Sequence, residues 1–186
     1  MSNPTKRFKS AIQLFDHLGI ECEIPIDIEL VADKLGIKVE NKEPTEEFKE
    51  IVGEIFFYED SPIIRVNPKK NSYLPRRRFT IAHEIGHYCL HSAESKQGFK
   101  DSQKAMSRTE SYWDRLESEA NNFAAQILMP AKQVYGIGKK VIATYKELTK
   151  AEKIPTGVFT ETMADRFQVS NKAMEYRLKN LRIIRN

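Results

Sequence analysis

Cysteine and long apolar runs are the two scarcest features of this sequence. Its two cysteines, Cys22 and Cys89, are far apart and form no CxxC pattern. A disulfide framework is therefore excluded, and we expect free, buried thiols in a reducing compartment. No apolar run approaches the roughly 18–20 residues that cross a bilayer. Asp16 and His17 interrupt what would be the apolar core of a signal peptide, so the sequence predicts a cytoplasmic protein.

Internal repeats and low-complexity segments are also absent, and the composition is that of a globular protein, with 40% hydrophobic and 30% charged residues. The net charge of +4 is unevenly distributed. Residues 132–186 contain 12 Lys and Arg against 5 Asp and Glu, whereas residues 1–131 contain 18 against 21. A basic C-terminal part favours an acidic partner, either nucleic acid or an acidic protein face. A solvated basic face that serves only solubility is the alternative.

Hydrophobic spacing predicts a mostly helical α+β fold with a small sheet ahead of a central helix. Helices are predicted at residues 5–19, from Pro25–Asp27 to Gly36, at 75–91, at 113–128, more weakly over 131–152, and as two segments joined at Gln168–Ser170. Strands are predicted at 37–40, 51–58 and 63–66, with a turn at Glu59–Pro62. Residues 92–111 are polar and without a period, which indicates a long loop. We expect a core over 1–131 and a basic helical segment over 132–186.

The stretch "HEIGH" places His83 and His87 four residues apart on the predicted central helix. Residues at that spacing lie one above the other, so the two imidazoles converge on one point, as two ligands of a tetrahedral Zn²⁺ must. Glu84 points about 100° around the helix, where its carboxylate reaches a metal-bound water instead of the metal. This is the HExxH arrangement, in which the glutamate acts as general base. The alternative, a polar cluster without function on a largely buried helix, would be costly.

His91 continues the four-residue spacing, but it is not expected to be the third ligand. It lies two turns, roughly 12 Å, along the helix from His83, and one zinc cannot hold both. The pattern HExxHxxGxxH is not followed either, because Leu90 and Ala93 replace its Gly and its last His. We expect His91 to be structural, or at most to lie at the rim of the site.

A carboxylate is the common third partner of a histidine pair on zinc. The helix predicted at 113–128 offers Glu117 and Glu119, which point about 200° apart, so only one can face the metal. Only Glu117 has a polar companion four residues later, Asn121, which is placed to hydrogen-bond a ligating histidine. The favoured ligand is therefore Glu117, with Glu119 as the open alternative. The buried side of this helix is predicted from its apolar residues, Leu116, Ala120, Phe123, Ala124 and Ile127.

These motifs resemble the ImmA/IrrE family of metallo-endopeptidases. The resemblance rests on "RRRFTIAHEIGHYCLH" and "ESEANNFAAQILMP", and it extends to "IPIDIELVADKLGIKV" and "IIRVN", so it covers most of the chain. It implies a zincin-type fold that binds one Zn²⁺ per chain. It also implies that His83 and His87 are ligands, that Glu84 is the catalytic base, and that the third ligand falls in the segment of Glu117 and Asn121. Members of the family cleave a helix-turn-helix repressor of the XRE type, which is the substrate that the resemblance implies.

The C-terminal stretch "MADRFQVSNKAMEYRLKNL", within about 158–180, has the rhythm of a helix-turn-helix. Ser170 would cap the second helix. Three basic residues would face phosphates: Arg177, Lys179 and Arg182. The same rhythm describes any two packed helices, and related peptidases carry a similar segment. A substrate-docking or structural role is therefore favoured over the reading of a DNA sequence.

Several further residues are candidates for smaller roles. Three tyrosines are candidate oxyanion donors, and spacing does not choose among them: Tyr73, Tyr88 and Tyr112. The run Arg76–Arg78 is placed to steady a substrate or to pack against a helix. Gly86 is expected to allow close packing with a neighbouring element, and Trp113 to lie in the core.

The competing functional class is a regulator that binds DNA or a repressor without cutting it, with a structural or vestigial metal site. The basic residues of 132–186 and the helix-turn-helix rhythm favour it. The intact Glu84 argues against it, because a structural zinc site has no need of a general base. The sequence therefore favours a zinc-dependent endopeptidase with this regulator as the alternative.

Overall fold

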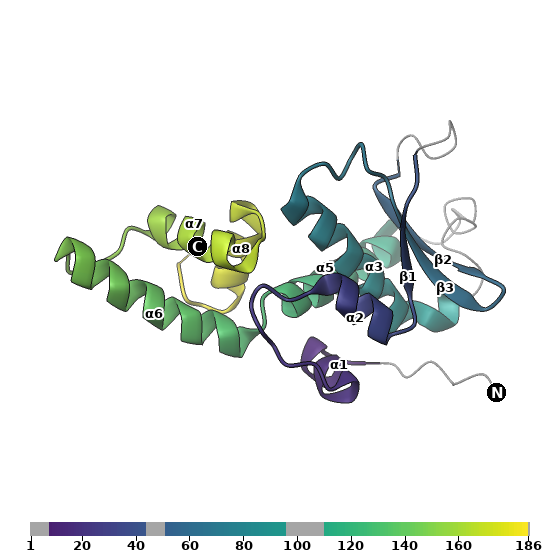
Figure 1. Ribbon diagram of the computed structural model, residues 1–186, viewed down its shortest axis with the longest axis horizontal. Coiled ribbons are helices and arrows are strands. Elements are labelled where there is room, and N and C mark those ends of the chain that lie inside the picture. The colour runs from purple at the N-terminus through teal and green to yellow at the C-terminus, as the bar shows by residue number, and fades with distance from the viewer. Residues whose placement is uncertain (1–7, 44–50, 96–109, 186) are drawn as a thin grey trace.

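The computed structural model describes residues 8–43, 51–95 and 110–185, with the side chains of 92–95 and 110–114 left aside (Figure 1). The helices are α1 (Ala11–Leu18), α2 (Ile28–Lys34), α3 (Leu74–Ser95), α5 (Glu110–Leu128), α6 (Ala131–Thr149), α7 (Thr156–Phe167) and α8 (Asn171–Asn180). The strands are β1 (Lys38–Asn41), β2 (Gly53–Tyr58) and β3 (Ser61–Val66). The prediction of a mostly helical α+β fold with a small sheet is confirmed.

The sheet has the strand order β1-β3-β2, with β1 parallel and β2 antiparallel to β3. Strands β2 and β3 form a hairpin whose two turn residues, Glu59 and Asp60, have φ angles of 46° and 63°. Positive φ at both turn residues matches the twist of a two-residue hairpin. Ile55 and Ile64 are paired in register and both are buried. The sheet thus offers an apolar face to α3, which packs on β2 and β3.

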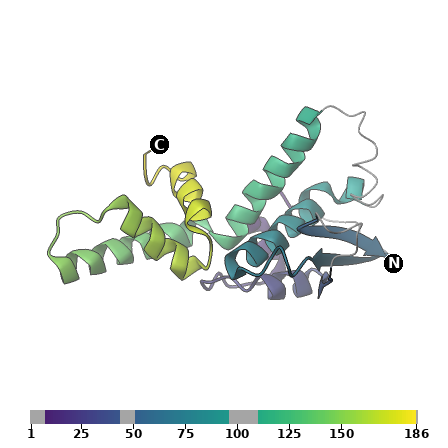
Figure 2. The same ribbon diagram turned by 90° about the horizontal axis from the view of Figure 1, so that it is seen from above.

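The α3 and α5 helices pack closely, and this contact positions the site. Gly86 of α3 lies against the backbone of Ala120, where an added Cβ would come within 3.0 Å of the Ala120 carbonyl oxygen. The expectation that Gly86 allows close packing is confirmed. The predicted apolar face of α5 is buried as expected: Leu116, Ala120, Phe123, Ala124 and Ile127. Figure 2 shows α3 and α5 between the sheet on one side and the C-terminal helices on the other.

The C-terminal helices pack through a row of buried side chains that are part of the same hydrophobic core cluster as the rest of the chain: Phe159, Met163, Phe167, Met174 and Leu178. Helices α7 and α8 are joined at Gln168, which has a left-handed backbone with φ 52°. Ser170 caps α8, and its side chain accepts a hydrogen bond from the Ala173 backbone N–H at 3.2 Å, as predicted. The division of the chain at residue 131 stays a prediction.

Two buried arginines tie this helical pair to the rest of the chain. Arg78 of α3 donates from Nε to the Gln168 carbonyl oxygen at 3.2 Å and from a terminal nitrogen to the Ile26 carbonyl oxygen at 2.8 Å. Arg177 of α8 donates from Nε to the Met129 carbonyl oxygen at 2.9 Å. The expectation that Arg177 faces phosphates is therefore wrong, because its guanidinium is buried and satisfies the carbonyl just past the end of α5.

Several predicted boundaries are corrected. The helix predicted over 5–19 begins at Ala11 among the described residues, and its buried side is formed by Ala11, Leu14 and Phe15. Strand β2 begins at Gly53 instead of residue 51, and strand β3 begins at Ser61 instead of residue 63.

The ends of the predicted long loop are also wrong, because α3 continues to Ser95 and α5 begins at Glu110. Residues 96–109 lie outside the described residues. The weak helical signal over 131–152 is one continuous helix, α6. Cys89 is buried as predicted, whereas Cys22 is only partly buried. Among the described residues, every helix is too short or too polar to cross a membrane.

Candidate metal centre

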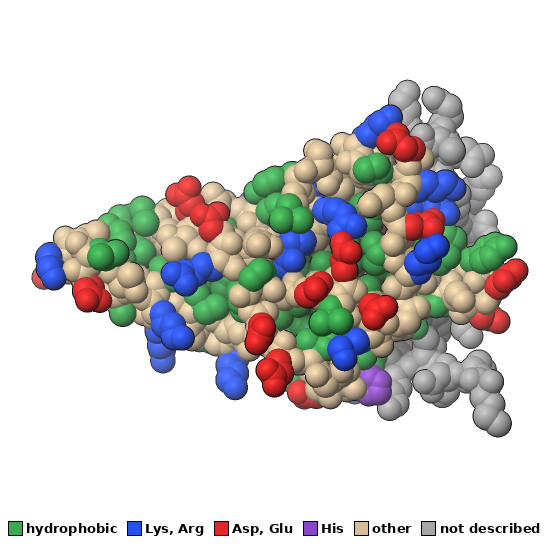
Figure 3. All heavy atoms as spheres, in the orientation of Figure 1, with side chains coloured by type: hydrophobic (Ala, Val, Ile, Leu, Met, Phe, Trp, Pro, Cys, Tyr) green, Lys and Arg blue, Asp and Glu red, His purple; other side chains and the backbone are tan. Residues whose placement is uncertain are grey.

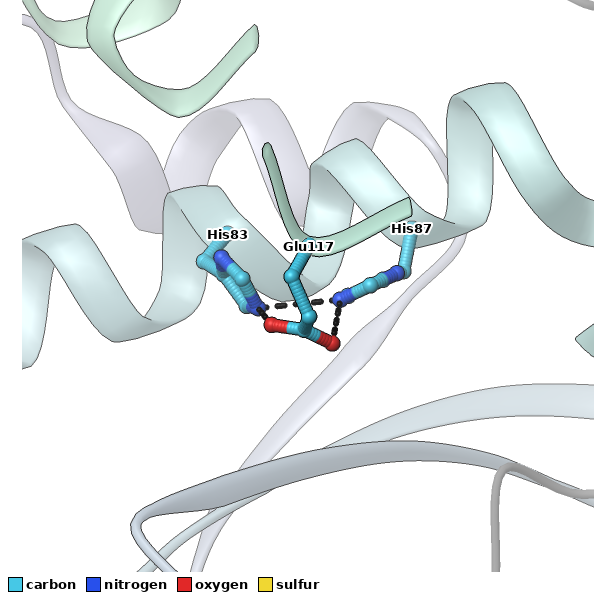
Figure 4. A group of neighbouring side chains, drawn as sticks. All are labelled: His83, His87 and Glu117. Carbon is cyan, nitrogen blue, oxygen red and sulfur yellow. Dashed lines mark hydrogen bonds and ion pairs between the residues drawn. The ribbon is translucent and has the colours of Figure 1, made fainter. Parts of the chain in front are cut away.

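Three predicted ligand residues meet between α3 and α5 (Figure 4). His83 and His87 project from successive turns of α3, and their Nε2 atoms lie 2.9 Å apart. Glu117 enters from α5 and places one carboxylate oxygen 3.2 Å from His83 Nε2 and the other 3.3 Å from His87 Nε2. The structure therefore brings together side chains that are 34 positions apart in sequence, as counted from His83 to Glu117.

The hydrogen bond of His83 on its outer side fixes which ring nitrogen faces inward. His83 Nδ1 lies 3.0 Å from Asn121 Oδ1, which can only accept a hydrogen bond. His83 Nδ1 must therefore carry the hydrogen, and the lone pair of Nε2 points toward Glu117. Asn121 occupies the place predicted for it, one turn of α5 beyond Glu117.

The outer side of His87 is held by His91, a contact that the sequence did not predict. His87 Nδ1 lies 3.2 Å from His91 Nδ1, and His91 Nε2 lies 3.1 Å from a carboxylate oxygen of Glu119. A carboxylate accepts, so His91 donates from Nε2 and accepts at Nδ1 from the Nδ1–H of His87. His91 is only 3% exposed and lies behind the site instead of at its rim. Glu119 is engaged by His91, away from the point where His83, His87 and Glu117 meet.

These outer hydrogen bonds leave three electron-pair donors facing one another: two imidazole Nε2 atoms and one carboxylate. Without a positive charge between them such an arrangement is repulsive, so the donor set fits a cation. Two imidazoles and one carboxylate form the donor set that Zn²⁺ takes in catalytic sites. The edge of a zinc tetrahedron with these ligands is about 3.3 Å, close to the three separations in the structure, 2.9, 3.2 and 3.3 Å.

The electrostatics of the group point the same way. Before a metal binds between them, the neighbouring rings of His83 and His87 hold the pKa of the Glu117 carboxyl well below its usual range. The pKa of His87 is lowered, first by burial and also by the neighbouring His83 and His91, although Glu117 opposes this. Burial also acts to lower the pKa of His83, but Glu117 and Glu84 outweigh it and the net pKa is raised. Glu117 is thus an anion at neutral pH, as a metal ligand must be.

Glu84 lies next to the cluster on the side of the sheet. Its side chain is 7% exposed and accepts a hydrogen bond from the backbone of Ile55 in β2. Burial, together with the charges of Glu117 and Glu54, raises the pKa of Glu84 to about 7, against the opposing effects of His83 and that hydrogen bond. A carboxyl group with a pKa near neutrality can take up and return a proton during a reaction.

The other predicted residues are dispersed. Tyr73 is exposed near the start of α3, and Tyr88 is half-buried beside Phe57, with ring centroids 6.2 Å apart. The side chains of Tyr112 and Trp113 lie outside the described residues. No one of the candidate oxyanion donors is singled out by this arrangement.

The run Arg76–Arg78 separates into three environments. Arg78 is buried in the contacts described above. Arg77 forms an ion pair with Glu29 of α2. Arg76 is exposed and lines a groove between α3 and α8. The sequence did not reveal this groove, because its walls come from three segments far apart in the chain.

A family profile and a curated relative point to the same family, and a solved structure shares the fold. The sequence profile of the IrrE N-terminal-like domain, a peptidase family, matches residues 32–179. The chain is 30% identical over 82 residues to Metallopeptidase ImmA of Bacillus subtilis (strain 168), an alignment that covers 40% of this chain and 45% of that relative. It thus spans less than half the length of this curated relative. A Mycobacterium tuberculosis transcriptional regulator has a similar fold, with a TM-score of 0.50, 19% identity, and coverage of 91% of this chain and 44% of that one.

Proposed function

Since the chain belongs to the IrrE N-terminal-like domain family, we propose that it is a zinc-dependent endopeptidase that uses the cluster between α3 and α5. The observation that carries this proposal is the convergence of three electron-pair donors with a buried carboxyl beside them. In the proposal His83, His87 and Glu117 hold one Zn²⁺ per chain. The metal, when bound, supplies a Lewis acid that polarises the scissile carbonyl and acidifies water.

The roles of the protein's own residues follow from their placement. Asn121 and His91 hold the two imidazoles in the tautomer that presents Nε2 to the metal. Glu84 would take a proton from the attacking water and pass it to the leaving amine, a role for which its buried position beside the two histidines places it. The hydrophobic packing of α3 against β2 and β3 keeps Glu84 buried and so sustains its raised pKa.

The substrate that we propose is an XRE-type helix-turn-helix repressor. Support comes from the resemblance to the ImmA/IrrE family, whose members cleave such repressors. A cytoplasmic location is part of the same proposal, because a transcriptional repressor acts there.

The experiment has two steps, and the first is the metal content of tag-free wild type, His87→Ala and Glu117→Ala. We expect about one zinc per chain in the wild type and little in either variant, since each removes one of three protein ligands. Glu161→Ala, an exposed glutamate on α7, is the control and should keep the metal. Failure of the wild type to take up a divalent metal would contradict the proposal.

In the second step the chain is co-expressed with a candidate XRE-type repressor. The wild type should cleave the repressor, whereas Glu84→Gln should bind zinc normally and leave it intact, because the amide cannot accept the proton. A Glu84→Gln variant that cleaves at the wild-type rate would remove Glu84 from the proposed role.

The alternative is a regulator that binds DNA or a repressor and does not cut. The specific observation in its favour is the excess of basic residues in 132–186, 12 against 5 acidic. Salt-dependent binding of the intact chain to random duplex DNA, combined with normal repressor levels on co-expression, would support this function instead.

A further inference from the structure

A groove of about 670 Å³ opens beside the metal centre, between the start of α3, the second half of α5 and α8. Its volume lies within the range of roughly 300–1,000 Å³ that is typical of ligand clefts. Figure 1 shows α8 facing the first turns of α3, and in Figure 3 hydrophobic and basic side chains are exposed along that boundary. Asn121, the hydrogen-bond partner of His83, forms part of its wall, so one end of the groove lies next to His83, although the three ligand residues themselves do not line it.

One face of α5 connects the cluster to the far end of the groove. Glu117, Asn121, Ala125 and Met129 follow one another at intervals of four residues, and the last three line the groove. At 1.5 Å per residue the groove runs about 12 Å along the helix axis from Asn121 to Met129, which matches about four residues of extended chain at roughly 3.3 Å each. The groove therefore has the length of a short peptide segment, and one end of that segment would lie next to His83.

The walls of the groove are apolar and carry charge of one sign only. Phe79, Ala125 and Ala173 supply apolar surface. Of the fifteen residues that line it, three are Lys or Arg and none is Asp or Glu. Two of the basic residues, Arg76 and Lys172, are exposed, and no side-chain partner for either is found within 8–43, 51–91 and 115–185.

The acidic residue nearest in sequence on α8 does not reach the groove. Glu175 does not line the groove and pairs with Lys179 at 2.8 Å, although it lines a second pocket together with Lys172. The ion pair of Glu175 is thus made with Lys179 and not with Lys172. Such a surface complements a chain that presents apolar side chains together with carboxylates.

The same placement disfavours duplex DNA as the occupant. A recognition helix reads DNA by entering a major groove about 12 Å wide. The face of α8 that bears Lys172, Ala173 and Tyr176 is opposed across the groove by Tyr73 and Arg76 of the α3 region. This face of α8 is therefore one wall of a groove and not a free-standing recognition helix, which favours an extended peptide as the occupant.

We propose that this groove binds an extended, apolar and acidic segment of the protein substrate near the scissile bond, with α8 and the turn before it as one wall. The inference rests on the proposed function, because it takes the occupant to be the substrate. It assigns Arg76 and Lys172 to the recognition of carboxylates and Tyr176 to contact with apolar side chains.

The test measures peptide binding, which needs no cleavage. The probes are fluorescein-labelled ten-residue peptides that alternate Leu with Asp, Leu with Lys, or Ser with Asp, together with a labelled random 20-bp duplex. Fluorescence anisotropy would be recorded with the full, zinc-loaded chain at 0.15 M salt. The variants are Arg76→Glu with Lys172→Glu, which reverses the charge, and Ala173→Trp, which fills the groove.

The matched control is Lys139→Glu with Lys140→Glu, the same change of charge at two exposed positions on α6, outside the residues that line the groove. We expect the Leu–Asp peptide to bind at least tenfold more tightly than the other two peptides. The charge reversal and Ala173→Trp should each weaken this binding at least tenfold, and the control less than threefold. Unchanged zinc content and circular dichroism would show that the variants are folded.

Three results would overturn the proposal: equal binding of the Ser–Asp and Leu–Asp peptides, equal losses in the control and the charge reversal, or a preference for the duplex that the charge reversal abolishes. The proposed function fails separately, by loss of repressor cleavage or of zinc. If the chain binds the Leu–Asp peptide, and the groove variants weaken that binding as expected, but no repressor is cleaved, the proposal for the groove stands and the peptidase function is rejected.

Discussion

At the scale of single residues, the most informative feature is the pair formed by His91 and Glu119. The sequence left Glu119 open as the alternative metal ligand and predicted that His91 is structural or at most lies at the rim. The structure gives them another position, in which Glu119 orients His91 and His91 accepts a hydrogen bond from His87. The hydrogen bond on the outer nitrogen of a ligating histidine fixes its tautomer and raises its basicity.

We therefore predict that His91→Ala lowers zinc affinity about 10–100-fold because the His87 ring loses its orienting partner. Glu119→Gln should have a smaller effect in the same direction, since an amide oxygen still accepts from His91. The measurement is competition for zinc against a chromogenic chelator. His17→Ala, an exposed histidine on α1, is the control and should leave the affinity unchanged. If His91→Ala binds zinc with unchanged affinity, His91 does not orient His87 and only packs behind it.

At the scale of secondary-structure elements, the contact between α3 and α5 decides whether the centre exists. The two histidines belong to one helix and the carboxylate to the other, so a small change in the spacing of the helices moves Glu117 relative to both rings. Gly86 lies at the contact between α3 and α5. The backbone of Ala120 occupies the space that a side chain at position 86 would need.

Gly86→Ala should accordingly destabilise the chain by about 1–2 kcal/mol, because the new methyl group meets backbone at 3.0–3.1 Å. It should also weaken zinc binding by moving α5 outward. Gly136→Ala is the matched control on α6, where nothing lies within 4 Å of the added carbon, and it should stabilise by about 0.5–1 kcal/mol. Urea unfolding of both variants gives the comparison. An equal increase in the free energy of unfolding of both variants would contradict this prediction, because the α3–α5 contact would then accommodate the new methyl group without loss of stability.

At the scale of the whole molecule, the C-terminal helices are connected to the rest of the chain by a continuous hydrophobic core and by the buried arginines. Arg78 joins α3 to two distant segments, the loop before α2 and the turn between α7 and α8. This connection sets the position of α8 across the groove from α3.

Arg78→Ala should lower the free energy of unfolding by about 1–3 kcal/mol, since two carbonyl groups lose their donor. The same change should weaken binding of the Leu–Asp peptide, because the wall formed by α8 is no longer held. Arg76→Ala, two residues earlier and exposed, should change stability by less than about 0.5 kcal/mol. Chemical denaturation followed by anisotropy on the same samples measures both effects. Equal stability of the two variants would show that the connection does not depend on Arg78.

Features that depend on short-range spacing follow from the sequence alone. The four-residue interval of His83 and His87, the periodicity of α3 and α5, and the cap at Ser170 are properties of single helices, and each is found in the structure. The ligand roles of His83, His87 and Glu117 stay predictions until metal is measured.

Tertiary structure decided what depends on which faces meet. Glu117 and Glu119 are alternatives on one helix, and only the packing of α5 on α3 turns Glu117 toward the two histidines and leaves Glu119 to His91. The burial of Arg177, predicted to face phosphates, and the groove between α3, α5 and α8 arise in the same way. Helical period fixes the relative direction of side chains on one helix, but the energy of packing between distant segments selects the face that is buried.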